Sequence, residues 1–131
     1  MPAQDVANIE IAAAFVRVKM LRRIADIEEA DRLQSDIERA TRTAGLTAVM
    51  FDYRGVVGHD ESVRSAMWEW AAVCGLQALA LLVDGELSRV RMNMTALSKR
   101  VPIRAFLTED DAMAWLTDPA GRRPTREIKP P

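Results

Sequence analysis

The sequence predicts a single α/β domain with a mostly parallel mixed β-sheet that begins with a β-hairpin. Apolar stretches alternate along the chain with segments of helical periodicity, a pattern typical of strand–helix–strand units with right-handed crossovers. The first two strand-like stretches follow each other with no helix between them, which indicates one antiparallel strand. A chain of 131 residues is also long enough to bury a continuous core.

The N-terminal third is predicted to contain the hairpin and the first helix. The hairpin lies within residues 9–24, where residues 15–20 alternate apolar and basic side chains like a strand with one solvent-facing side. From Asp26 the apolar residues follow three- and four-residue spacing. Asp26 is a suitable N-cap for this helix, and Gly45 ends it.

Two buried strands and two helices are predicted next. Residues 46–53 are almost continuously apolar, as expected for a central strand covered on both faces. A helix is predicted over residues 60–73 and a second buried strand over residues 79–83. A third helix follows, and its apolar stripe consists of Leu87, Val90, Met94 and Leu97.

The last strand and helix precede a segment of different composition. Residues 102–107 read as a strand, and Thr108 with Asp111 approximates a capping box for a short final helix. From Thr117 onward the chain has prolines and charges but no apolar stripe. We therefore assign residues 1–117 to one domain and residues 118–131 to a flexible C-terminal tail.

Composition argues against several classes of function. The net charge is −1, from 18 basic and 19 acidic side chains, whereas nucleic-acid binders usually carry a positive excess. One cysteine allows no intramolecular disulfide, and one histidine with one cysteine makes a poor zinc site, so we predict no metal and no cofactor. With no apolar run long enough to span a bilayer and no signal-peptide pattern, a cytoplasmic protein is expected.

The basic side chains of the hairpin region form a candidate binding surface. A basic strand face could bind acidic lipid or nucleic acid, but we expect acidic residues of the first helix to neutralise it. The residues concerned are Arg17, Lys19, Arg22 and Arg23.

The junction between the central strand and the second helix is the most informative segment. Residues 51–56 read Phe-Asp-Tyr-Arg-Gly-Val, and residues 60–62, Asp-Glu-Ser, begin a helical pattern. In open α/β sheets, ligands and partners are met at the carboxyl ends of parallel strands. The ligand-facing loops are therefore expected at residues 53–60 and 84–86.

This junction and the order of elements resemble the STAS domain, the fold of bacterial anti-sigma-factor antagonists, and the related SpoIIAA-like family. The family motif is a strand ending Leu-Asp-Leu-Ser-Gly-Val, three variable residues, and then Asp-Ser-Ser-Gly at a helix start. Residues 51–56 occupy the first part and residues 60–62 the second. Residues 103–116 are similar to the closing strand and helix of SpoIIAA-like proteins. The resemblance covers most of the chain.

The resemblance implies that Ser62 is a candidate phosphoacceptor and that Asp60 lies at the base of the second helix. A phosphate at a helix N-terminus is favoured by free N–H groups and by the helix dipole. Glu61 replaces the family's first serine and Val63 its glycine, and a carboxylate beside the hydroxyl would repel an incoming phosphoryl group. The alternative is that Asp60 and Ser62 simply cap the helix.

The resemblance also points to a docking surface on the same helix. Trp68 lies off the stripe of apolar residues that the helix turns inward, and a partly exposed Trp is a frequent interface anchor. The alternative is a helix that is buried more widely than one stripe. The residues that we predict to form the motif and the interaction surface are Asp52, Gly55, Asp60, Glu61, Arg64 and Trp68.

By this resemblance the chain is a non-catalytic, regulatory protein–protein interaction module. Its partner would be a protein such as an anti-sigma factor, a kinase-like protein or another regulator; no nucleic acid and no integral membrane segment are expected, and homodimerisation is left open. One alternative is a small lipid- or hydrophobic-ligand-binding protein of the SpoIIAA-like, CRAL-TRIO-related type. Another is a small hydrolase, which would need a hydroxyl–imidazole contact between Ser62 and His59 at roughly hydrogen-bond distance.

Overall fold

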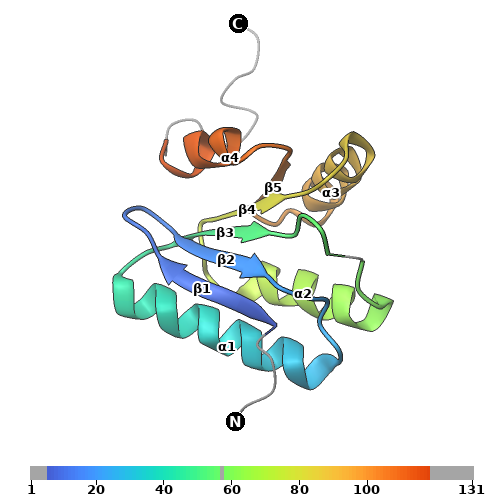
Figure 1. The fold of residues 1–131 in the computed structure, drawn as a ribbon, viewed down its shortest axis with the longest axis horizontal. Helices are drawn as coiled ribbons and strands as arrows, with labels where there is room; N and C mark the ends of the chain where they lie inside the picture. The colour runs from blue at the N-terminus through green and yellow to red at the C-terminus, as the bar shows by residue number, and fades with distance from the viewer. Residues whose placement is uncertain (1–5, 57, 119–131) are drawn as a thin grey trace, which may run out of the picture.

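The fold is an α/β domain around one five-stranded sheet (Figure 1). The computed structural model describes residues 6–56 and 58–118, so all of the predicted tail except Asp118 lies outside the described residues. The strands follow each other across the sheet in chain order, with β1 antiparallel to β2 and the remaining pairs parallel. This confirms the mixed sheet with an N-terminal hairpin. The strands are β1 Ala7–Ile11, β2 Val16–Met20, β3 Ala48–Asp52, β4 Ala78–Leu82 and β5 Ile103–Phe106.

Four helices surround this sheet in the described residues. Helices α1 and α2 cover one face, α4 covers the opposite face, and α3 lies at the edge formed by β5 (Figure 1). Within the described ranges, no helix is both long and apolar enough to cross a membrane. The helices are α1 Ile27–Ala44, α2 Glu61–Val73, α3 Glu86–Lys99 and α4 Glu109–Leu116.

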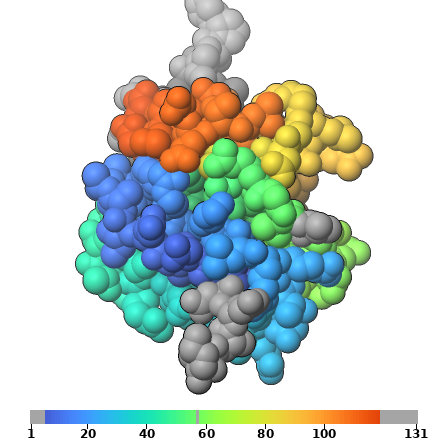
Figure 2. Space-filling model, viewed as in Figure 1, coloured from blue at the N-terminus to red at the C-terminus, as the bar shows by residue number. Residues whose placement is uncertain are grey.

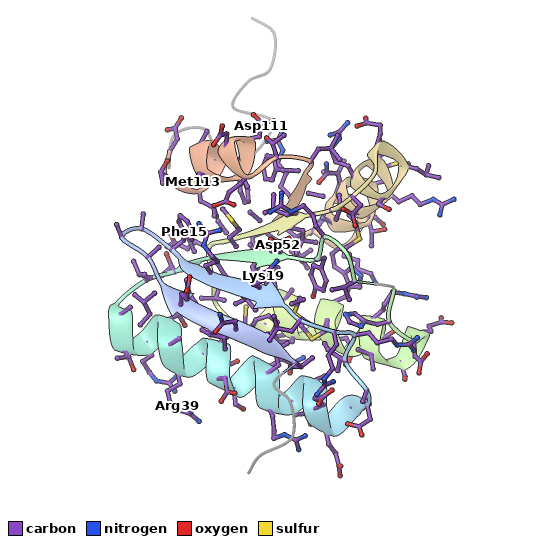
Figure 3. All side chains as sticks on the ribbon, viewed as in Figure 1. Phe15, Lys19, Arg39, Asp52, Asp111 and Met113 are labelled. Carbon is purple, nitrogen blue, oxygen red and sulfur yellow. The ribbon has the colours of Figure 1, made fainter. Side chains whose placement is uncertain are left out.

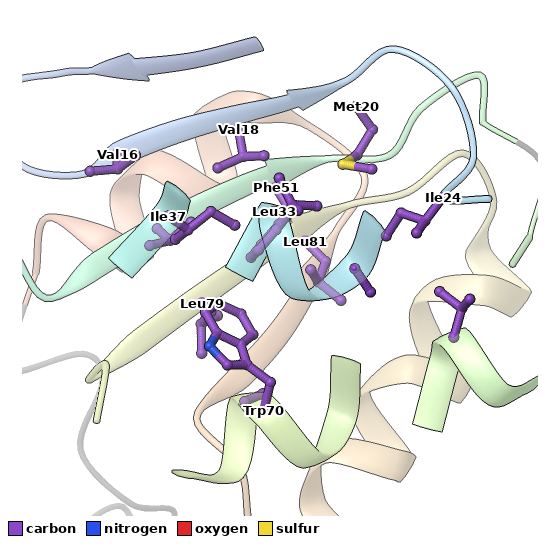
Figure 4. Packing of buried hydrophobic residues seen from close by; sticks show 14 of the residues in the cluster. Val16, Val18, Met20, Ile24, Leu33, Ile37, Phe51, Trp70, Leu79 and Leu81 are labelled. Atoms are coloured by element: carbon purple, nitrogen blue, oxygen red, sulfur yellow. The ribbon is translucent and has the colours of Figure 1, made fainter. Parts of the chain in front are cut away.

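The larger core lies between the sheet and helices α1 and α2 (Figure 4). Side chains of alternate strand residues, such as Val18 and Phe51, meet Leu33 and Ile37 of α1 there. Trp70 of α2 packs edge-on against Phe51 at 6.4 Å between ring centroids, and its indole N–H donates to Glu38 Oε2 at 2.7 Å. The indole therefore ties α2 to α1 as well as to the sheet.

The smaller core lies under α4. It consists of the side chains that the same strands turn to the opposite face of the sheet. Ala48, Ala78 and Ala80 present small side chains on this face, which lets Ala112 and Leu116 of α4 approach closely. Strands β3 and β4 are buried along their whole length because each face of the sheet is covered.

The predicted helix ends are confirmed at α1 and α4. Asp26 accepts a hydrogen bond from the Glu29 N–H at 2.8 Å, and Thr108 Oγ1 accepts from the Asp111 N–H at 3.2 Å. Gly45 ends α1 at φ 69°, a left-handed conformation that favours glycine.

Helix α3 is confirmed, but its apolar stripe does not face the sheet. Leu87, Val90, Met94 and Leu97 are 62%, 37%, 66% and 75% exposed. The opposite side of the helix contacts β5, where Asn93 accepts from the Ala105 N–H at 2.7 Å and donates to its carbonyl at 3.3 Å. Spacing shows which residues share a helix face, but it does not show which face the sheet contacts.

Candidate functional site

The carboxylate of Asp52 lies at the end of β3, where the predicted site begins. The residue is 4% exposed, and its oxygens accept three hydrogen bonds from Arg54: from the backbone N–H at 3.1 Å, from Nε at 3.0 Å and from Nη2 at 2.9 Å. Lys19 Nζ lies 3.6 Å from Asp52 Oδ2, and the two side chains are seen together in Figure 3. The side-chain hydrogen bonds from Arg54 lower the pKa of Asp52, so this buried carboxylate is ionised at neutral pH.

Further ion pairs extend the Asp52–Arg54 interaction across the face of the sheet that α4 covers. Glu109, the first residue of α4, lies 2.6 Å from Arg17 Nη2 and 3.9 Å from Arg54 Nη2. The network therefore joins β2, the end of β3 and the start of α4.

The basic residues of the hairpin region are neutralised, but mostly not by the first helix. Arg22 pairs with Glu29 of α1 at 2.6 Å, as expected. The partners of the other three lie elsewhere: Glu109 for Arg17, Asp52 for Lys19 and Asp60 for Arg23. The expectation that α1 neutralises this surface is thus correct for one residue of four. The other three carboxylates come from the end of β3, the start of α4 and the residue before α2, which the fold brings beside the hairpin region.

The loop after β3 is fastened to the end of β4. Gly55 has a φ of 83°, which favours glycine, and its N–H donates to Asp84 Oδ2 at 2.7 Å. The two loops predicted at the carboxyl edge of the sheet therefore do meet. Asp84 joins the site as a residue whose structural role the sequence motif did not show.

The far end of the loop is held by His59 and its neighbours. His59 Nδ1 accepts from the Ile24 N–H at 3.2 Å, which leaves the ring proton on Nε2. Burial, together with Arg23 and Arg64, lowers the pKa of His59, in agreement with a neutral ring. Arg64 Nη1 donates to the His59 carbonyl at 2.8 Å, and Asp60 accepts from Arg23 at 2.6 Å.

Glu61 and Ser62 form the exposed first turn of α2. Asp60 occupies the N-cap position, but its side chain makes no capping hydrogen bond because it pairs with Arg23 instead. Simple side-chain capping by Asp60 is therefore wrong. Among the hydrogen bonds of the described residues, none joins Ser62 to His59, so the contact that a Ser62 hydrolase would need is not formed here.

A cavity of about 280 Å³ lies between α2, α3 and the sheet, beneath this loop. Trp68 is half-buried in its wall, and Arg64 also lines it, whereas the other predicted site residues do not. His59 also lines the cavity, and its Nε2 is buried with no hydrogen-bond partner among the described residues. Apolar side chains make up most of the lining, including Phe51, Val56, Met67, Ala71, Leu79, Leu81, Val83, Met92 and Ile103.

Two of the cavity residues that sequence reasoning missed come from α3. Ser88 and Met92 line it from the helix side opposite the exposed stripe. In the sequence these two residues are marked only by lying outside the apolar stripe of the predicted helix. Over residues 6–56 and 58–118, no group of three His, Cys, Asp or Glu side chains is arranged to hold a metal ion.

Comparison with known protein families identifies one family that matches the chain. Residues 10–119 match the family described as a domain of unknown function, DUF7793. The chain belongs to this family. No curated protein matches it.

Solved structures resemble this DUF7793 chain in fold. An uncharacterized DUF3478-family protein with a SpoIIAA-like fold, from Shewanella loihica PV-4, is 17% identical with a TM-score of 0.64, covering 84% of this chain and 91% of that one. An anti-sigma factor antagonist from Mycobacterium paratuberculosis is 19% identical with a TM-score of 0.55, over 86% and 93% of the two chains. The anti-sigma factor antagonist SpoIIAA in its unphosphorylated form is 18% identical with a TM-score of 0.54, over 82% and 92%. The DUF7793 chain thus has the STAS-like, SpoIIAA-like fold that its sequence resemblance predicted.

The lowered pKa of Asp52 predicts a pH-dependent contribution to stability. Because the pKa is lower in the folded chain than the ordinary 3.8, the contribution is complete above about pH 4 and is lost as the pH falls further. We expect Asp52→Asn to cost about 1–3 kcal/mol of unfolding free energy at pH 7 and to lose less than wild type between pH 7 and pH 3. Urea unfolding at the two pH values measures both.

The matched control is Asp36→Asn, which removes an exposed carboxylate paired with Arg39 on α1. It should cost less than about 1 kcal/mol and leave the pH dependence unchanged. Glu29, whose pKa Arg22 lowers to about 2, retains its own acid sensitivity in every variant. Equal losses for Asp52→Asn and wild type over this pH range would contradict the assignment.

Proposed function

We propose that this chain is a non-catalytic regulatory module that binds a protein partner through the loop of residues 54–60 and the exposed side of α2. The fold shared with anti-sigma factor antagonists supports the regulatory class. The observation that carries the proposal is that hydrogen bonds hold Gly55 and His59 of this loop, and the first turn of α2 that follows is exposed. We assign the function to residues 1–117.

The described residues of the loop, 54–56 and 58–60, are suited to binding because hydrogen bonds hold them before a partner arrives. Gly55 is held by Asp84, the His59 ring accepts from the backbone of Ile24, and Arg64 holds the His59 carbonyl. A surface that is ordered in the free protein loses less conformational entropy on binding. All three hydrogen bonds involve residues outside the loop, so the rest of the domain supplies the order.

Ser62 gives this surface a means of control. Its side chain is exposed one residue into α2, beside the exposed Glu61. A phosphate there would add about two negative charges to a surface that already carries Asp60 and Glu61. The added charge would repel an acidic partner surface and attract a basic one. Modification of Ser62 would therefore switch partners rather than unfold the helix.

Affinity capture from the native lysate, quantified by mass spectrometry, tests the proposal. We expect wild type to retain a regulatory protein partner, Trp68→Ala to retain it at least about tenfold less, as for an interface hot spot, and Ser62→Asp to change which proteins are retained. Arg39→Ala, on the exposed side of α1, is the matched surface control and should capture as wild type does. Capture of the same proteins by all four versions, or of none by wild type, would contradict the proposal.

A second candidate function is binding of a small apolar ligand, which the cavity beneath the loop favours. Its volume of about 280 Å³ is close to the lower limit for ligand sites, so it suits a small ring system rather than a long acyl chain. Arg64 adds positive charge at the wall of this cavity. The fitting ligand is therefore apolar with an anionic oxygen.

Titration with anilinonaphthalene sulfonate (ANS) checks this candidate, since the probe combines aromatic rings with an anionic oxygen group. We expect its fluorescence to rise on binding and Ser88→Trp, at the exposed mouth of the cavity, to remove more than about half of the gain. Ser65→Trp, an exposed α2 residue outside the lining, is the control. Equal gains for the two variants would exclude the cavity as the binding site.

A further inference from the structure

The exposed stripe of α3 is an apolar feature that the proposed function leaves unexplained. Its members, defined above as Leu87, Val90, Met94 and Leu97, are on average more exposed than buried, although all four are apolar. Figure 2 shows α3, in gold, as a lobe that projects from the body of the molecule. Monomeric proteins rarely leave such a continuous apolar helix face in water.

We propose that this stripe pairs with the same stripe of a second copy of the chain, with the two α3 helices antiparallel. The spacing of the four residues is three, four and three, which is the a/d spacing of a coiled-coil seam. This spacing reads the same in both directions along the helix. In an antiparallel pair, Leu87 therefore meets Leu97 of the other copy, and Val90 meets Met94.

The charges at the two ends of α3 fit the same arrangement. Asp84 and Glu86 lie at its exposed N-terminal end, whereas Lys99 and Arg100 lie at its exposed C-terminal end. Antiparallel pairing places each acidic end beside a basic end and opposes the two helix dipoles. Parallel pairing would bring the two basic ends together instead.

Three features indicate that the pairing is weak and reversible. Glu86 already forms a short ion pair with Arg89 of its own helix, so its attraction for the other copy is shared. The two copies of Arg91 come near each other at the centre of an antiparallel pair, although this exposed side chain can extend into water. One pair of 14-residue helices also buries less area than a standard stable interface, so we expect a dissociation constant of roughly micromolar or weaker.

Sedimentation velocity over a concentration series tests self-association. We expect the weight-average mass of wild type to rise from 14.6 kDa toward about twice that value, and Met94→Glu to remain monomeric with an unchanged circular-dichroism spectrum. Val73→Glu is the matched control because Val73 is an 80% exposed apolar residue on α2. A wild type that stays monomeric at all concentrations, or a Met94→Glu dimer, would overturn the proposal.

Disulfide trapping tests the orientation in a Cys74→Ser background, which removes the only native thiol. Antiparallel pairing predicts that a mixture of Leu87→Cys and Leu97→Cys proteins forms a mixed disulfide about tenfold faster than either protein alone. Faster homodisulfides at either position would overturn the antiparallel geometry. These outcomes are independent of the partner-binding surface on α2, which the capture experiment tests separately.

Discussion

The buried carboxylate of Asp52 is the interaction on which the geometry of the site depends. A charge at the end of a central strand is costly unless it is paired and hydrogen-bonded, and Arg54 meets that need with both its backbone and its guanidinium. This fixes the direction in which the chain leaves β3. Through Arg54 and Glu109 the same charge reaches α4, so one electrostatic network positions the loop and one of the covering helices.

The features with functional meaning follow from that exit direction. The chain turns at Gly55 onto Asp84, returns at His59 onto the segment before α1, and enters α2 with Glu61 and Ser62 exposed. The loop covers the cavity between α2 and α3 at the same time, so a partner at the α2 surface and a ligand in the cavity would both contact it. The cavity exists because α3 packs on β5 rather than closely on α2.

Most of the fold could be predicted from the sequence, because local rules determine it. Strand and helix periods, the Asp26 cap and the left-handed Gly45 depend on residues close in sequence. The site could be predicted only in position. Contacts between distant segments determine which carboxylate pairs with Arg23 and which face of α3 is exposed. For α3, the hydrogen bonds between Asn93 and the backbone of β5 hold the opposite face against the sheet.

Amide hydrogen exchange of Gly55, followed by NMR, tests the central claim most directly. If the Asp52 network fixes the loop, the Gly55 N–H that donates to Asp84 exchanges slowly in wild type and at least about tenfold faster in Asp52→Asn. The Leu81 amide in buried β4 should remain protected in both proteins and serves as the internal reference. Unprotected exchange at Gly55 in wild type, or unchanged protection in Asp52→Asn, would contradict the account.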